Sequence, residues 1–138
     1  MNPSGESRHP AAFPLERSEL EQPIGDRLAR VVEQFPDHRA LECGDVRYTY
    51  RELLAEVRRI AAAVAGNTPP GPGCVANLVD HSPEMVFCPL GVVTAGKASL
   101  GIHPGLPASA QREIIQDALP ELLLTTAEHE PRALEITA

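Results

Sequence analysis

The fold is decided by residues 74–125, which read CVANLVDHSPEMVFCPLGVVTAGKASLGIHPGLPASAQREIIQDALPELLLT. Short apolar runs at residues 74–79, 98–102 and 122–125 alternate in this stretch with segments that carry helix signals. Such alternation predicts strand–helix–strand crossovers, which join parallel strands. The first run is apolar apart from one asparagine, as is typical of a strand that is buried on both faces of a parallel sheet. The sequence therefore predicts an α/β fold with a small parallel sheet built from β-α-β-α-β crossovers.

Prolines mark both predicted crossover helices. Ser82 and Pro83 predict the start of the first helix, with Ser as the N-cap and Pro at a position where its missing N–H costs nothing. Pro89 falls inside this helix and predicts a kink near Met85, because it removes the hydrogen bond to that carbonyl. Further prolines bound the second helix, over residues 107–120.

A helix and a short β-hairpin are predicted ahead of the sheet. Apolar residues recur at helical spacing from Ile24, and Pro36 ends this helix because it disfavours helical backbone at Phe35. Residues 40–43 and 46–49 then flank a Gly-Asp pair, whose glycine can adopt the positive φ of a tight turn.

A longer helix follows the hairpin. Thr49 stands three residues before Glu52, which predicts a capping box in which each side chain satisfies a free backbone N–H. One face of this helix is apolar. The residues on that face are Leu53, Val57, Ile60, Ala61 and Val64. We expect Gly66 to close the helix in a left-handed conformation.

The composition is that of one globular domain and excludes several partner classes. The chain has 138 residues, 43% of them hydrophobic, and a formal net charge of -7. No basic run occurs, which argues against a nucleic-acid or anionic-membrane surface. No apolar stretch is long enough for a membrane span or a signal peptide. Cys43, Cys74 and Cys88 fit neither a disulfide framework nor a paired metal motif, so we expect a cytoplasmic protein.

Residues 91–98, GVVTAGKA, nearly match the phosphate-binding pattern G-x-x-x-x-G-K-[ST]. That pattern needs a strand before it and a helix after it, so that backbone N–H groups converge on the phosphates. Here a predicted helix leads into a predicted strand, and Ala98 lacks the hydroxyl that would hold magnesium. We therefore interpret Gly96 as a helix cap and expect Lys97, the single lysine, to reach solvent over apolar neighbours.

Polar side chains follow two of the predicted strands. Asp80 and His81 follow the first, and His103 follows the second. All three should lie at the carboxyl edge of the sheet, where open α/β folds usually bind ligands. They could bind a metal or move a proton, but no helix-spaced second ligand or orienting partner accompanies them. We assign no catalytic, cofactor-binding or metal residue, and solvated loop residues are the default interpretation.

The remaining histidines and Cys88 carry no sign of chemistry. His9, His38 and His129 lie in polar segments. Cys88 lies on the apolar face of a predicted helix and is interpreted as a small core residue.

From Ile24 to Thr125 the chain resembles the beginning of adenylate-forming enzymes, which comprise acyl-CoA synthetases, luciferases and the adenylation domains of nonribosomal peptide synthetases. The segments that carry the resemblance are Phe35-Pro36-Asp37 with Ala40-Leu41, Tyr48-Thr49-Tyr50-Arg51-Glu52-Leu53, Ser82-Pro83-Glu84, Gly91 to Gly96, Pro104 and Pro107, and Leu122-Leu123-Leu124-Thr125. Three residues depart from the family pattern. His103 stands where the family usually has Asp or Asn, Gln111 takes a position more often apolar, and Pro89 interrupts a helix that is normally continuous.

The resemblance implies a role in activating a carboxylate with ATP, which gives an acyl-adenylate and pyrophosphate. ATP and magnesium serve the complete family enzymes. The family's phosphate loop, adenine contacts, hinge and catalytic lysine are expected beyond the end of this sequence, so no functional residue is carried over. We expect the chain alone to use no cofactor and to need a partner chain or missing remainder for catalysis. Whether it is an enzyme, and whether the substrate is an amino, aryl or fatty acid, stays open.

We therefore expect three parts in the chain and two main roles for it. Residues 1–23 are interpreted as a flexible arm pinned by Phe13 and Leu15, residues 24–126 as the N-terminal subdomain, and residues 127–138 as a tail.

A protein partner or a second copy of the chain should cover an exposed apolar face. The alternative role is a small noncatalytic binding or regulatory module that uses the polar edge of the sheet. A fragment without a selected role is a third interpretation.

Overall fold

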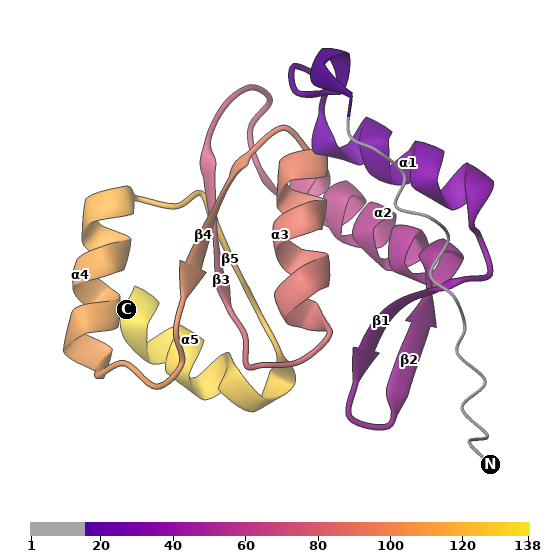
Figure 1. Cartoon of the computed structure of the whole chain (residues 1–138). Coiled ribbons are helices and arrows are strands. Elements are labelled where there is room, and N and C mark those ends of the chain that lie inside the picture. Colours follow the sequence, from indigo (N-terminus) through magenta and orange to yellow (C-terminus); the bar gives the residue numbers. More distant parts are fainter. Residues whose placement is uncertain (1–15) are drawn as a thin grey trace.

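Figure 1 shows the computed structural model of the chain, which describes residues 16–138. The elements are η1 (Arg17–Glu19), α1 (Ile24–Gln34), β1 (Arg39–Cys43), β2 (Val46–Thr49), α2 (Tyr50–Asn67), β3 (Cys74–Leu78), α3 (Glu84–Thr94), β4 (Ala98–Ile102), α4 (Ala108–Ala118), β5 (Leu122–Thr125), η2 (Ala127–His129) and α5 (Glu130–Thr137). The expected anchors Phe13 and Leu15 lie outside the described residues.

A three-stranded parallel sheet with the order β4-β3-β5 forms the centre of the structure (Figure 1). The crossover helices α3 and α4 connect its strands, so the predicted α/β fold is confirmed. β1 and β2 pair separately as an antiparallel hairpin. Gly44 in the hairpin turn has a φ of 59°, which confirms the role expected for this glycine.

The core on one face of the sheet is built with α2 and α3. Its buried residues are Leu53, Val57, Ile60, Val64, Val75, Phe87, Cys88 and Val92. The two helices approach closely because Gly91 has no side chain. A Cβ at that position would lie 2.5 Å from Ile60 Cγ2, well inside van der Waals contact. The apolar face predicted for α2 is therefore the face that packs against α3.

The core on the other face is built with α4 and α5. Its buried residues are Ala76, Leu78, Ile102, Ala133 and Ile136. Residues 127–138, interpreted from the sequence as a tail, form η2 and α5. Because α5 buries Ala133 and Ile136, this segment is part of the folded structure.

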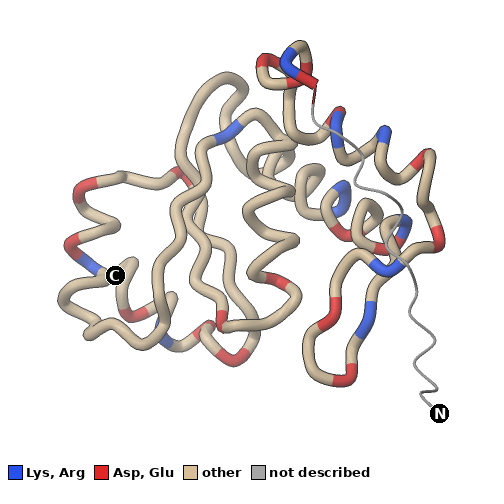
Figure 2. Tube along the Cα trace, in the orientation of Figure 1, with Lys and Arg blue, Asp and Glu red and all other residues tan. Residues whose placement is uncertain are grey.

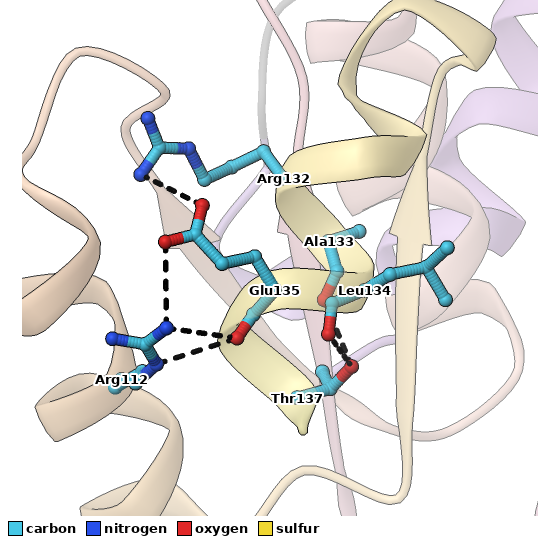
Figure 3. A network of polar contacts seen from close by, with 6 residues as sticks. All are labelled: Arg112, Arg132, Ala133, Leu134, Glu135 and Thr137. Atoms are coloured by element: carbon cyan, nitrogen blue, oxygen red, sulfur yellow. Dashed lines mark hydrogen bonds and ion pairs between the residues drawn. The ribbon is translucent and has the colours of Figure 1, made fainter.

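Polar contacts also join α5 to α4, as Figure 3 shows. Arg112 on α4 donates from Nη2 to Glu135 O over 3.2 Å and forms an ion pair with Glu135 Oε1 at 3.3 Å. Arg132 pairs with the other carboxylate oxygen of Glu135 at 3.4 Å. Thr137 Oγ1 donates to Ala133 O over 2.8 Å near the end of the helix.

The C-terminus of α2 differs from the prediction. The expected left-handed cap at Gly66 is wrong, because α2 continues to Asn67 and Gly66 has no positive φ. Side chains satisfy the last carbonyls instead. Asn67 Nδ2 donates to Ala63 O over 2.7 Å, and Thr68 Oγ1 donates to Val64 O over 2.8 Å. The capping box at the other end, between Thr49 and Glu52, is confirmed.

The start of α3 also differs from the prediction. Ser82 does not cap the helix with its side chain, because its Oγ is buried without a hydrogen-bond partner. Its backbone enters the turn instead, since Ser82 O accepts from Met85 N over 3.0 Å. α3 is continuous across Pro89, and the kink expected near Met85 stays a prediction.

The residues just before α1 are tied to that helix. η1 lies inside the segment interpreted as a flexible arm. Glu19 of η1 forms ion pairs with Arg27 and with Arg30, the latter at 2.8 Å. A hydrogen bond from Glu16 N–H, and then the contact with Arg27, hold the pKa of the Glu19 carboxyl below its ordinary value. Residues 16–23 are therefore ordered against α1.

Charges of both signs are interspersed over α1, α2 and the hairpin (Figure 2). Several exposed arginines pair with nearby carboxylates, for example Arg39 with Glu42 at 2.6 Å and Arg51 with Asp37 at 3.1 Å. Within residues 16–138, none of the helices has the length and apolar character needed to cross a membrane.

Candidate functional site

The structure brings Asp80, His81 and His103 to one pocket of about 430 Å³, called the edge pocket below. It lies at the carboxyl ends of β3 and β4. These strands pair with Leu78 opposite Ile102, so the loops that follow them emerge side by side. All three residues are exposed, as expected for solvated loop residues. Their common position at the ligand-binding edge of an α/β sheet confirms the expected placement.

Asp80 has a partner that the sequence analysis missed. Its Oδ2 lies 2.6 Å from His129 Nε2 at the start of α5. The two residues are far apart in sequence and meet because η2 and α5 fold back along the sheet. Nothing in the local sequence around His129 predicts this contact, since it depends on the packing of α5.

His103 and Gln111 together shape the loop after β4. His103 Nδ1 accepts a hydrogen bond from Gly105 N over 2.9 Å, so one ring nitrogen serves the local turn. Gln111 is fully buried and its Nε2 donates to His103 O over 2.9 Å. Both residues depart from the family pattern, and the structure joins them through this hydrogen bond.

Asn77 is the buried polar residue among those that line the edge pocket. It is 3% exposed, and its Nδ2 donates to Ser99 Oγ on β4 over 2.6 Å. Its Oδ1 is buried without a partner. A buried carbonyl without a hydrogen bond is costly and rare in native proteins. The sequence analysis missed Asn77 as a site residue, although its place as the single polar residue of the β3 run was a usable signal.

The glycine–lysine motif forms no phosphate cradle in this structure. Gly96 ends α3 with a φ of 79°, which confirms its role as a cap, and the chain then enters β4. The expectation that Lys97 reaches solvent is wrong, because its side chain is only 3% exposed. Lys97 Nζ donates to Pro69 O over 2.6 Å and to Glu121 Oε2 over 2.8 Å. A buried ammonium needs such partners, which explains why the side chain turns inward.

No metal cluster is found within the described part of the chain, and Cys88 is not a reactive thiol. No group of three or more His, Cys, Asp or Glu side chains in residues 16–138 is arranged to hold a metal ion. Burial, and then the nearby charge of Glu84, raise the pKa of the Cys88 thiol to about 11. Cys88 is therefore the core residue that the sequence predicted.

Comparison with known proteins identifies the family. The model of the family described as AMP-binding enzyme matches residues 28–138. An isonitrile lipopeptide synthase of Mycobacterium tuberculosis is 37% identical over 105 residues, which cover 75% of this chain and 4% of that protein. A dimodular nonribosomal peptide synthase of Bacillus subtilis is 36% identical over 93 residues, which cover 67% of this chain and 4% of that protein. The chain thus spans a small fraction of the length of these relatives.

Solved structures show the same fold. An anthranilate CoA ligase, AuaEII, in complex with anthranoyl-AMP superposes with a TM-score of 0.74 and 26% identity, over 82% of this chain and 22% of that chain. The N-terminal subdomain of Klebsiella oxytoca NpsA superposes with a TM-score of 0.68 and 24% identity, over 74% of this chain and 26% of that chain. The chain belongs to the AMP-binding enzyme family and corresponds to the N-terminal part of an AMP-dependent synthetase or ligase.

Proposed function

We propose that residues 24–138 act as the N-terminal scaffold of an adenylate-forming ligase, and that the groups handling ATP lie outside the described residues. The reaction proposed for the complete assembly is attack of a substrate carboxylate on ATP, which forms an acyl-adenylate and releases pyrophosphate. The chain's part in this proposal is to supply packed structure for another segment or another chain.

The position of Lys97 is the observation that carries the proposal. Stabilising the charge that develops on a triphosphate requires magnesium and cationic donors close to the phosphates. Lys97 is the single lysine of the chain, and its ammonium is engaged with Glu121 and Pro69 O inside the fold. The glycines beside it end a helix and so direct no helix N-terminus toward a ligand.

The edges of the parallel sheet are the surfaces on which a further segment or partner would pack. β4 and β5 are its outer strands, and each pairs with β3 alone among residues 16–138. Edge strands present unpaired backbone groups that another strand can complete. In this proposal a partner chain or a second copy contacts these edges, and ATP and magnesium bind only in the completed assembly.

ATP–pyrophosphate exchange by the purified chain tests the proposal. With MgATP and a panel of amino, aryl and fatty acids, we expect no exchange above a reaction without protein. A complete adenylate-forming ligase in the same assay is the positive control. Exchange that depends on both the chain and one carboxylate would refute the scaffold role.

The second candidate function is a small noncatalytic binding or regulatory module. The observation that favours it is the edge pocket, with Asp80, His81 and His103 at its mouth. Titration with divalent metals, nucleotides and acyl-adenylates would distinguish the two roles, because a scaffold without its partner should bind none of them. Saturable binding that perturbs His81 or His103 would favour the module.

A further inference from the structure

The edge pocket is a slot between α3 and β4. Met85 and Pro89 of α3 line it on one side, and Gly101 of β4 lines it on the other. A volume of about 430 Å³ lies within the range of pockets that bind small molecules. Most of these lining groups are apolar, so the walls favour an apolar ligand body.

Gly101 makes room for this slot. It lies opposite Asn77 in the β3–β4 register, so both residues face the α3 side of the sheet. A Cβ built at Gly101 would meet no protein atom within 4 Å. The missing side chain therefore leaves open space beside Asn77 that no neighbouring side chain fills. A glycine inside a strand often marks a place where a ligand approaches the backbone.

Asn77 provides the polar end of the slot. Its amide nitrogen is engaged with Ser99 Oγ, whereas its Oδ1 is buried and without a partner. Because Asn77 lines the pocket, a ligand whose hydrogen-bond donor reached this carbonyl would satisfy it. This requirement selects a ligand with an O–H or N–H group at its inner end, because an acceptor would face an unpaired carbonyl.

The charges around the pocket disfavour an anion. Among residues 16–138, the pocket lining includes neither lysine nor arginine. The carboxylate at the mouth, Asp80, already pairs with His129 at 2.6 Å. An anionic ligand would thus find no permanent cation inside the pocket and would meet a carboxylate at its entrance.

We infer that the edge pocket binds an uncharged small molecule with an apolar, ring-sized body and a hydrogen-bond donor that reaches Asn77 Oδ1. A phenol or an uncharged aromatic amine has this chemistry. The inference concerns the edge pocket alone, and it stands whether or not residues 24–138 serve a ligase. A negative exchange assay therefore leaves it unaffected.

The test is an NMR titration of the ¹⁵N-labelled full chain with phenol. We expect saturable shifts of the Gly101 amide and the Asn77 side-chain amide at millimolar phenol. Anisole has the same ring but no donor, and benzoate is its anionic counterpart. Both should bind about tenfold more weakly than phenol, because one hydrogen bond to the buried carbonyl is lost. Equal binding of phenol and anisole, or absence of saturable shifts at Gly101, would overturn the inference.

Two variants locate the site. Gly101→Leu places a side chain in the slot and should abolish phenol binding, while the matched change Gly66→Leu, at an open position on α2, should leave it intact. Asn77→Leu removes the carbonyl and should make phenol and anisole bind alike. If Asn77→Leu does not fold, comparison of Gly101→Leu with Gly66→Leu still tests where phenol binds. Unchanged phenol binding by folded Gly101→Leu would place the ligand elsewhere and contradict the inference.

Discussion

Lys97 joins three segments at the amino ends of the parallel strands. Its Nζ contacts Pro69 O in the loop before β3 and Glu121 just before β5, while the residue itself leads into β4. Gly73 completes the arrangement, since a Cβ there would lie 2.4 Å from the Glu121 carboxylate. The ammonium is thus a structural group that fixes the starts of all three strands relative to one another.

Removal of this ammonium should destabilise the protein. Lys97→Met leaves Pro69 O without its donor and Glu121 without its cation, so we expect a loss of about 2 kcal/mol in the free energy of unfolding. Urea denaturation followed by circular dichroism measures it. Glu121→Gln keeps an acceptor but leaves the buried ammonium without its counter-anion, so it should cost a comparable amount. Equal stability of wild type and Lys97→Met would show that the buried pair is not a structural constraint.

Cys88 gives a prediction about pH. Its thiol pKa is raised to about 11 from its ordinary value of 9.0, chiefly by burial, so the folded state favours the protonated form. The contribution of this group to stability is complete below pH 9 and is lost as the pH rises toward 11. Iodoacetamide at pH 8 should therefore modify the partly exposed Cys43 and Cys74 well before Cys88. Mass spectrometry of the alkylated peptides measures the order, and early modification of Cys88 would contradict its burial.

At the scale of elements, the parts that the sequence predicted are those with local signals. The strands of the sheet follow from apolar runs, the hairpin from its Gly-Asp turn, and the start of α2 from the capping box at Thr49 and Glu52. α5 was missed because its helical character depends on burying Ala133 and Ile136 against the sheet. The end of α2 was misplaced because Asn67 and Thr68 cap it through side chains, an option that the prediction for Gly66 ignored.

The contact between α2 and α3 can be tested by changing glycine to alanine at two separate positions. Gly91→Ala places a methyl group 2.5 Å from Ile60 Cγ2, and we expect a loss of about 2 kcal/mol in the free energy of unfolding. Gly66→Ala meets no atom within 4 Å and should raise stability by up to about 1 kcal/mol, because alanine favours helix. Thermal unfolding of both variants measures the difference. Two changes of the same sign and size would refute the close packing at Gly91.

At the scale of the whole molecule, the amino and carboxyl ends of the parallel strands differ in structure. The amino ends are held by the buried Lys97 and Glu121 pair, and the carboxyl ends open into the edge pocket. The sequence predicted Asp80, His81 and His103 at the carboxyl edge of the sheet because position in a parallel sheet follows from strand order. It could not predict His129 or the free carbonyl of Asn77, because these depend on how α5 and β4 pack in three dimensions.

The central claim is that residues 24–138 supply structure and do not hold the triphosphate. Titration of the ¹⁵N-labelled full chain with MgATP tests this most directly, with the backbone amides of residues 91–98 as reporters. We predict no saturable shift at these amides, because Lys97 stays paired with Glu121 inside the fold. Saturable shifts centred on Gly96 and Lys97 would show that this segment binds phosphate and would contradict the claim.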